Sequence, residues 1–228
     1  MQKLILAVAL AVMAHSAQAQ VAEAPQAKSS YLGLGLTSLS GYYTGPNESA
    51  DDIAFAPTAL GSLGLSPAVA VRGSVAYRRN RVDRDESSAT QRFVQHQTTN
   101  NVVVPVLLQV TLNPAASRFH AALIGGLTFW HINQQGQQTY YYYYPSQPAT
   151  AVPQNLDQQR LDTFLTGGLN ASYQLTPQWV ALADLTINGR IGGEKKMYYE
   201  YLPSAGLMIG AGYKFGQSQV APRAAANR

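Results

Sequence analysis

Apolar and polar residues alternate along most of the chain with a period of two, which is typical of β-strands that have one apolar face. The clearest segment covers residues 204–215, where the apolar positions are Leu207, Ile209, Ala211, Tyr213 and Phe215. The positions between them hold Met208, Lys214 and three glycines. An α-helix would mix these two sets on every face, because its period is 3.6 residues. The pattern therefore predicts a strand rather than a helix.

The same alternation predicts eight strands in all. Besides 204–215, clear segments cover residues 161–175 and 179–190, and weaker ones cover 32–37, 55–65, 69–78, 101–112 and 119–133. Pro57 and Pro105 lie inside two of these segments. We expect a β-bulge at each, because proline cannot donate a hydrogen bond to a ladder.

Short and long connections follow one another in strict alternation between the predicted strands. The short ones, 66–67, 113–116 and 176–178, each contain proline. The long ones are polar and cover about 40–52, 82–97, 134–159 and 191–203. This is the connectivity of bacterial outer-membrane barrels, which have tight periplasmic turns and longer extracellular loops. It predicts that both chain ends lie on the periplasmic side.

Composition supports a membrane environment. Only 12% of the residues are charged, against about 25% in soluble domains. No stretch after the N-terminal segment has the length and apolarity of a membrane helix. Because lipid offers no hydrogen-bond partner to an open sheet edge, a membrane-spanning sheet must close. We therefore predict an all-β fold, an eight-stranded antiparallel up-and-down transmembrane β-barrel over residues 30–215.

The N-terminal end of the chain indicates export. Residues 1–19 have the features of a signal peptide: Lys3, the apolar stretch from Leu4 to Met13, and small residues at Ala17 and Ala19. We expect a periplasmic linker over residues 20–29 and a flexible tail over 216–228. The chain has no cysteine, which excludes disulfides and a lipoprotein anchor. The predicted location is the outer membrane of a Gram-negative bacterium.

Aromatic residues gather near both ends of the predicted strands, as the two girdles of a membrane barrel require. Those near the short turns and the chain ends are Tyr31, Phe119, Tyr173, Trp179, Tyr213 and Phe215. Those near the long connections are Tyr42, Tyr43, Tyr77, Phe93, Phe129, Trp130, Tyr140 to Tyr144, Tyr198, Tyr199 and Tyr201. The run Tyr140 to Tyr144 is expected where an extracellular loop leaves the outer girdle.

Four stretches together resemble the small outer-membrane β-barrel domain family of the eight-stranded OmpA/OmpX-like type. They read "NNVVVPVLLQVTL", "RFHAALIGGLTFWHI", "DTFLTGGLNASYQLTPQWVALADLTINGRIG" and "SAGLMIGAGYKFG". The resemblance implies insertion by the barrel-assembly machinery, which in such proteins recognises a last strand that ends in an aromatic residue. Phe215 fits that role, although thirteen further residues follow it here.

Polar residues on the predicted inward face suggest a filled lumen, because a barrel of eight strands is just wide enough for side chains. We expect Arg72, Arg78, Asp162, Asp184 and Arg190 to form a polar network there. A larger inward set adds Gln109, His120, Asn170, Asn188 and Lys214. The alternative to a packed plug is a narrow ion path.

Two surface sites are suggested by composition. Arg79 and Arg81 lie at the outer end of a predicted strand and could contact lipopolysaccharide phosphates; the alternative is a solvated loop neutralised by neighbouring carboxylates. Tyr141, Tyr143 and Tyr199 could form an aromatic platform for glycans or peptides; the alternative is a girdle without a ligand. The sequence predicts no partner beyond membrane lipid, the assembly machinery and an unknown surface ligand, and it shows no nucleic-acid-binding motif.

An enzymatic role is not expected, because the chain has no nucleophile elbow, metal-ligand spacing or phosphate loop. No cofactor or metal is expected either. The alternative function is a soluble, lipocalin-like barrel in the periplasm or medium that carries an apolar ligand. The two hypotheses differ in which face of the barrel is apolar.

Overall fold

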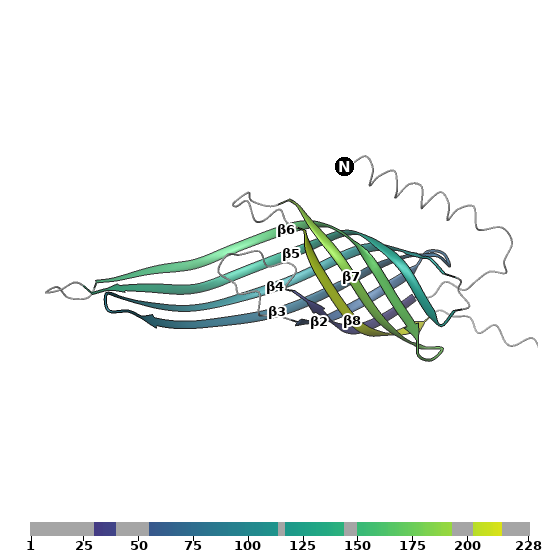
Figure 1. Ribbon diagram of the computed structural model, residues 1–228, viewed down its shortest axis with the longest axis horizontal. Helices are drawn as coiled ribbons and strands as arrows, with labels where there is room; N and C mark the ends of the chain where they lie inside the picture. The colour runs from purple at the N-terminus through teal and green to yellow at the C-terminus, as the bar shows by residue number, and fades with distance from the viewer. Residues whose placement is uncertain (1–29, 40–54, 114–116, 144–149, 193–202, 216–228) are drawn as a thin grey trace, which may run out of the picture.

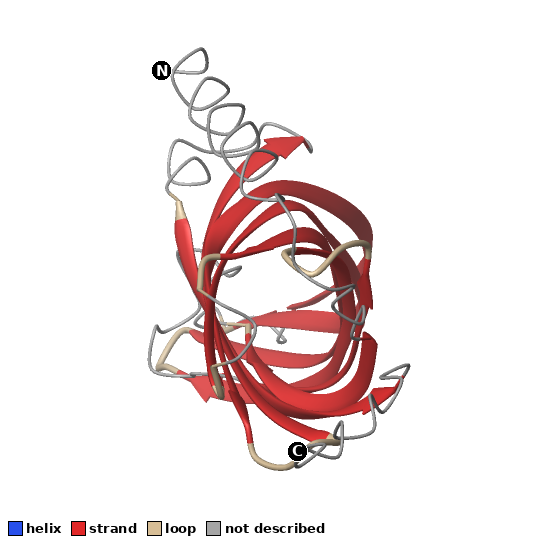
Figure 2. Ribbon diagram, turned by 90° about the vertical axis from the view of Figure 1, so that its right-hand side faces the viewer, coloured by secondary structure: helices blue, strands red, loops and turns tan. Residues whose placement is uncertain are grey.

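The barrel is closed and antiparallel throughout. The computed structural model describes residues 30–39, 55–113, 117–143, 150–192 and 203–215. These form β1 (Ser30–Ser38), β2 (Phe55–Gly64), β3 (Val69–Ser87), β4 (Gln91–Thr111), β5 (Phe119–Tyr142), β6 (Thr150–Gln174), β7 (Trp179–Gly192) and β8 (Ser204–Phe215). Each strand pairs with the next, and β8 returns to β1, so the sheet forms a ring (Figure 2). The predicted eight-stranded up-and-down barrel is confirmed.

The predicted signal peptide, linker and tail lie outside the described residues. Within the described ranges, no helix has the length and apolarity to cross a membrane.

The seam between β1 and β8 depends on glycine. Eight residue pairs join the two strands, from Ser30 opposite Phe215 to Thr37 opposite Met208. Gly33 lies opposite Gly212, and a Cβ at Gly33 would lie 2.2 Å from the carbonyl oxygen of Ala211. A Cβ at Gly212 would lie 2.9 Å from the ring of Tyr31. These positions have no side chain because the backbone and the lumen residues already fill the space.

The outward-facing positions form an apolar belt around the barrel. Leu34 is 73% exposed, Ile187 62% and Leu169 54%. The residues between them on each strand face the lumen and are largely buried, as the period of two requires. Large exposed apolar side chains on every strand are the outside of a membrane barrel, not the surface of a soluble carrier.

Four strands continue far beyond the barrel, which corrects the prediction of long loops at 82–97 and 134–159. Figure 1 shows β3, β4, β5 and β6 running on as a sheet past the ends of β1, β2, β7 and β8. We call this sheet, residues 78–87, 91–101, 132–142 and 150–160, the extension. Its strands have polar residues on both faces, so the apolar alternation that predicted the barrel strands is missing there. The predicted loops at 40–52 and 191–203 fall almost entirely outside the described residues.

The expected bulges at the two prolines are wrong. Pro57 pairs in register with Leu36, and Pro105 pairs in register with Thr128. The register shift in the described ladders lies instead between Thr163 and Phe164, where β6 meets β7.

Four of the aromatic assignments need correction. Tyr31 and Trp130 were expected in the girdles, but their side chains are buried at 7% and 2% exposure. The period of two turns Trp130 inward because its neighbour Phe129 faces outward. The described tyrosines of the run are not at the membrane surface: Tyr141 lies roughly 40 Å along β5 from Phe129, at about 3.3 Å per residue. The same holds for Phe93, which lies opposite Tyr140. Phe119, Tyr173, Trp179, Tyr213 and Phe215 are exposed near the short turns, as predicted.

A charge in the middle of the belt is expected to destabilise the barrel in lipid. Replacing Leu169 with Arg should lower the free energy of unfolding by about 2–4 kcal/mol, because the midplane offers no solvent to the guanidinium. Denaturant titration in lipid vesicles would measure this. Gln159→Arg is the matched control, since it changes an outward-facing residue of the same strand within the extension and should have little effect. Equal losses from both changes would contradict the position of the belt.

Candidate functional site

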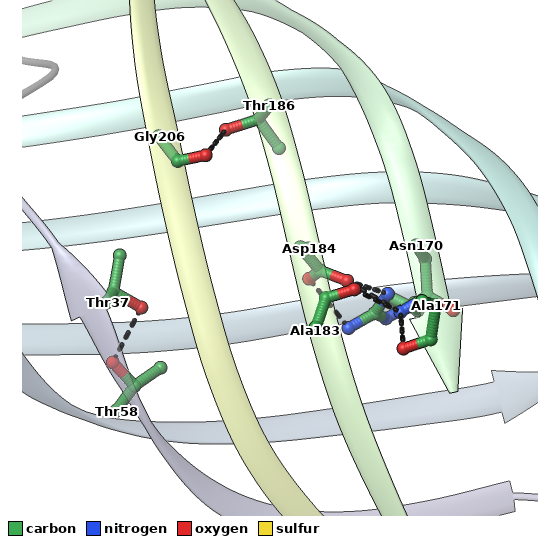
Figure 3. A network of polar contacts seen from close by, with 9 residues as sticks. Thr37, Thr58, Asn170, Ala171, Ala183, Asp184, Thr186 and Gly206 are labelled. Atoms are coloured by element: carbon green, nitrogen blue, oxygen red, sulfur yellow. Dashed lines mark hydrogen bonds and ion pairs between the residues drawn. The ribbon is translucent and has the colours of Figure 1, made fainter. Parts of the chain in front are cut away.

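The lumen contains a buried ion pair. Both terminal nitrogens of Arg72, on β3, donate to Asp184, on β7, at 2.9 Å each. Asn170 on β6 donates to the same carboxylate at 2.6 Å, and Figure 3 shows this amide and Asp184 pointing toward each other. The two charged side chains are only 6% and 8% exposed. This bidentate pairing satisfies charges that could not otherwise be buried.

A second charged group lies at the outer end of the lumen. Asp162 is completely buried, and its two carboxylate oxygens lie 2.7 Å from Arg190 and 2.7 Å from Arg160. Arg160 also lies over the ring of Trp130, 6.0 Å from its centre. The sequence pattern included Arg190 in this network but not Arg160. Arg78, which was expected to join it, donates its Nε–H to Asn80.

Two apolar clusters share the lumen with these polar groups, which was not predicted. One cluster consists of Leu39, Ala56, Ala76, Val103, Trp130 and Phe164. The other consists of Tyr31, Leu60, Val180, Leu182 and Met208. Beside Arg72 and Asp184 a cavity of about 40 Å³ is left, which is enough for bound water. Among the described residues, these apolar and polar side chains fill the lumen, and the cavity that is left is too small for a carried apolar ligand.

The apolar belt ends at one ladder row. Tyr77, Val102, His131 and Leu161 lie opposite one another across β3 to β6. The next outward-facing row consists of Arg79, Asn100, Asn133 and Gln159. The outer surface thus changes from apolar to polar within one step of two residues.

Arg79 and Arg81 both face outward just beyond this boundary. Arg81 forms an exposed ion pair with Asp83 at 2.9 Å, and His96 Nδ1 lies 2.8 Å from the same carboxylate. The hydrogen bond with His96, together with the charge of Arg81, lowers the pKa of Asp83 below its ordinary value. The carboxylates therefore neutralise part of this basic patch, as the solvated-loop alternative requires.

The structure describes two of the three tyrosines of the predicted platform, Tyr141 and Tyr143. Tyr141 lies on the outer face of β5, and Arg92 lies over its ring at 5.9 Å. Tyr143 is exposed and follows the last residue of the strand. Arg92 also pairs with Asp85 at 2.6 Å, and this hydrogen bond raises the pKa of the guanidinium. Tyr140 and Tyr142 lie on the opposite face. Tyr199 lies outside the described residues, so the structure does not place it beside the other two.

Within the described part of the chain, no three His, Asp or Glu side chains form a group that could hold a metal ion. His120 and His131, on the same strand, lie on opposite faces of the sheet.

The closed ladder, the apolar exterior and the packed polar lumen together define an integral β-barrel of the outer-membrane type. No protein-family model matches the sequence, and a search of curated proteins finds no match. Solved structures with a similar fold include Ail, the attachment invasion locus protein of Yersinia pestis, at 16% identity, a TM-score of 0.41, and coverage of 82% of this chain and 99% of Ail.

Two further similar structures are a major outer membrane protein from Thermus thermophilus and Escherichia coli outer membrane protein W. The Thermus protein is 16% identical, with a TM-score of 0.45 and coverage of 83% of this chain and 99% of that one. Outer membrane protein W is 14% identical, with a TM-score of 0.40 and the same coverage of the two chains. At these identities the likeness concerns the fold alone.

Breaking the Arg72–Asp184 pair on one side should be more harmful than removing it altogether. Asp184→Leu leaves a buried guanidinium without its carboxylate, which typically costs about 3–5 kcal/mol of unfolding free energy. The double change Arg72→Leu with Asp184→Leu should cost less, because no uncompensated charge is left. Unfolding titrations of the single and double variants in lipid would compare the two. A double variant that is less stable than Asp184→Leu would contradict this account of the lumen.

Proposed function

We propose that this protein is a non-enzymatic surface-interaction protein of the Gram-negative outer membrane. The barrel anchors the chain in the membrane, and the extension projects into the extracellular medium and carries the contacts with other molecules. Export through a cleaved signal peptide and insertion by the barrel-assembly machinery are part of this proposal. The outward-facing Phe215 at the end of β8 supports the latter.

The single observation that carries the proposal is the extension itself. Four strands continue well past the apolar belt with polar residues on both faces. Such a sheet has no core of its own and adds nothing to membrane anchoring. The extension lies in the segments that the sequence predicted as long connections, where β3 is joined to β4 and β5 to β6. Long connections lie on the extracellular side in barrels of this type. A sheet that extends only into water is best explained by recognition at the cell surface.

Lipopolysaccharide is the first partner we propose for the base of the extension. Arg79 follows Tyr77 on the outer face of β3, one step above the last apolar row. A guanidinium at this height can bind lipid phosphates through two parallel hydrogen bonds. Arg81 lies one further step outward and can join it by leaving its exposed pair with Asp83.

Site-specific labelling would test the orientation of the extension. The chain has no cysteine, so Asn155→Cys in the extension and Thr176→Cys in a short turn each supply one reactive thiol. We expect a bulky maleimide reagent to label the first in intact cells and the second only after the outer membrane is permeabilised. Labelling of Thr176→Cys but not Asn155→Cys in intact cells would overturn the proposal.

Binding of lipopolysaccharide should depend on the outward-facing arginines. Replacing Arg79 and Arg81 with Ser should weaken binding of purified lipopolysaccharide to the refolded barrel by roughly tenfold, because an exposed ion pair contributes about 0.2–1 kcal/mol and the loss of two such contacts, about 1.4 kcal/mol in total, corresponds to a factor of ten. Co-sedimentation would measure it. Arg84→Ser is the control, since Arg84 lies in the same strand but faces the other side of the sheet. Unchanged binding in the double variant would dispose of the lipopolysaccharide site.

A further inference from the structure

The far end of the extension has an aromatic cluster on its inner face, the face that continues the lumen. Tyr140 faces this side because it shares the parity of the buried Trp130 on the same strand. Phe93 lies opposite Tyr140, and their ring centres are 4.9 Å apart at an angle of 40°. The ring of Tyr142 is nearly parallel to that of Tyr140, at 6.4 Å and 16°.

This cluster borders a hollow of about 390 Å³ lined by Glu86, Ser87, Ser88, Gln91, Phe93 and Tyr140. Its volume falls within the range of small-molecule sites, which is about 300–1,000 Å³. Glu86 and Phe93 lie opposite each other in the ladder, and both line the hollow. The hollow thus combines aromatic faces, a carboxylate and an amide.

Folding does not require this arrangement. The extension has no apolar core at this height, and the neighbouring inner-face positions are largely amides, among them Gln95, Gln138 and Gln154. One cross-strand aromatic pair stabilises a ladder by roughly 0.2–1 kcal/mol, which can account for Phe93 with Tyr140. It does not account for the third ring, nor for a hollow with polar groups around it. The tip is also far from the membrane, so these rings are not part of a girdle.

We infer that this hollow binds the terminal sugar of a neutral glycan. A pyranose presents an apolar C–H face that packs on an aromatic ring, and hydroxyl groups that donate to a carboxylate and an amide oxygen. Glu86 disfavours phosphate groups, so the site differs from the basic patch of Arg79 and Arg81, which lies on the other face. The inference deepens the proposed surface role and rests on the extension being extracellular.

Saturation-transfer NMR on the full-length barrel in lipid nanodiscs tests this inference. The probes are the methyl glycosides of glucose, galactose, mannose and N-acetylglucosamine. We expect transfer to the ring C–H protons of at least one glycoside, reduced at least fivefold in Phe93→Ser with Tyr140→Ser. Glu86→Gln should reduce the saturation transfer to the same glycoside at least fivefold, although this change leaves every aromatic residue in place.

The matched control is Tyr141→Ser with Tyr143→Ser, which removes one ring from the opposite face of β5 and the ring of the residue that follows the strand. This control should leave the transfer unchanged. Heat-modifiable gel mobility verifies that each variant is folded. Absence of transfer with all four glycosides, or its persistence in the Phe93 and Tyr140 double variant, overturns the inference. The measurement uses purified protein, so its failure leaves the orientation experiment in cells unaffected and the two outcomes can be told apart.

Discussion

The structure depends on the pairing of backbone hydrogen bonds within a medium that offers none. In the bilayer core each unpaired N–H or C=O group is costly, so the first and last strands must find each other. Here β1 and β8 pair over eight positions, and this closure is what allows every belt residue to face lipid. The close backbone approach at Gly33 shows how little space the seam leaves. The apolar exterior follows from the closure of the sheet, because the outer face of a closed barrel is the face that contacts lipid.

Beyond the membrane the constraint disappears, and the architecture changes accordingly. Among the described residues four of the strands continue, and the sheet they form can remain open because water satisfies the backbone groups at its edges. The edge formed by β3 carries Arg79, Arg81, Asp83 and Asp85, charges that discourage pairing with another sheet. On the β6 edge Pro153 removes one backbone donor. The extension can therefore stay an open sheet and present two different faces, one with Arg79 and Arg81 and one with the Phe93 cluster.

The lumen follows a third rule, set by its narrow width. Eight strands leave space only for side chains, and these side chains include both apolar clusters and paired charges. The Arg72 guanidinium and the Asp184 carboxylate come from strands on different sides of the ring and meet inside it. Asp162 is held between two arginines near the mouth. Each of these buried charges is thus compensated locally, and the lumen acts as the rigid interior of a membrane anchor.

Much of the fold could be predicted from the sequence alone. The period of two assigned Leu207, Ile209 and Leu169 to the outside and Asp184 and Asn188 to the lumen, because in a strand each side chain's face depends only on its parity. Strand 204–215 was predicted with its observed ends. The alternating connection lengths gave the order of the strands, since antiparallel neighbours need only short turns.

Other features could be decided only by the tertiary structure. The extension escaped prediction because its two faces are both polar, which leaves no periodic signal to separate strand from loop. The partners of Arg72 and Asp162 depend on which strands face each other across the ring, and residue spacing does not contain that information. The sequence also could not predict that the tyrosine run is divided between two faces, because the run was expected in a loop, and only a strand places alternate side chains on opposite faces. The face on which each side chain of a strand lies was thus a local property that the sequence determined by itself. The contacts across the lumen and at the far end of the extension depend on how the strands are arranged in the ring and in the extension, which only the tertiary structure decided.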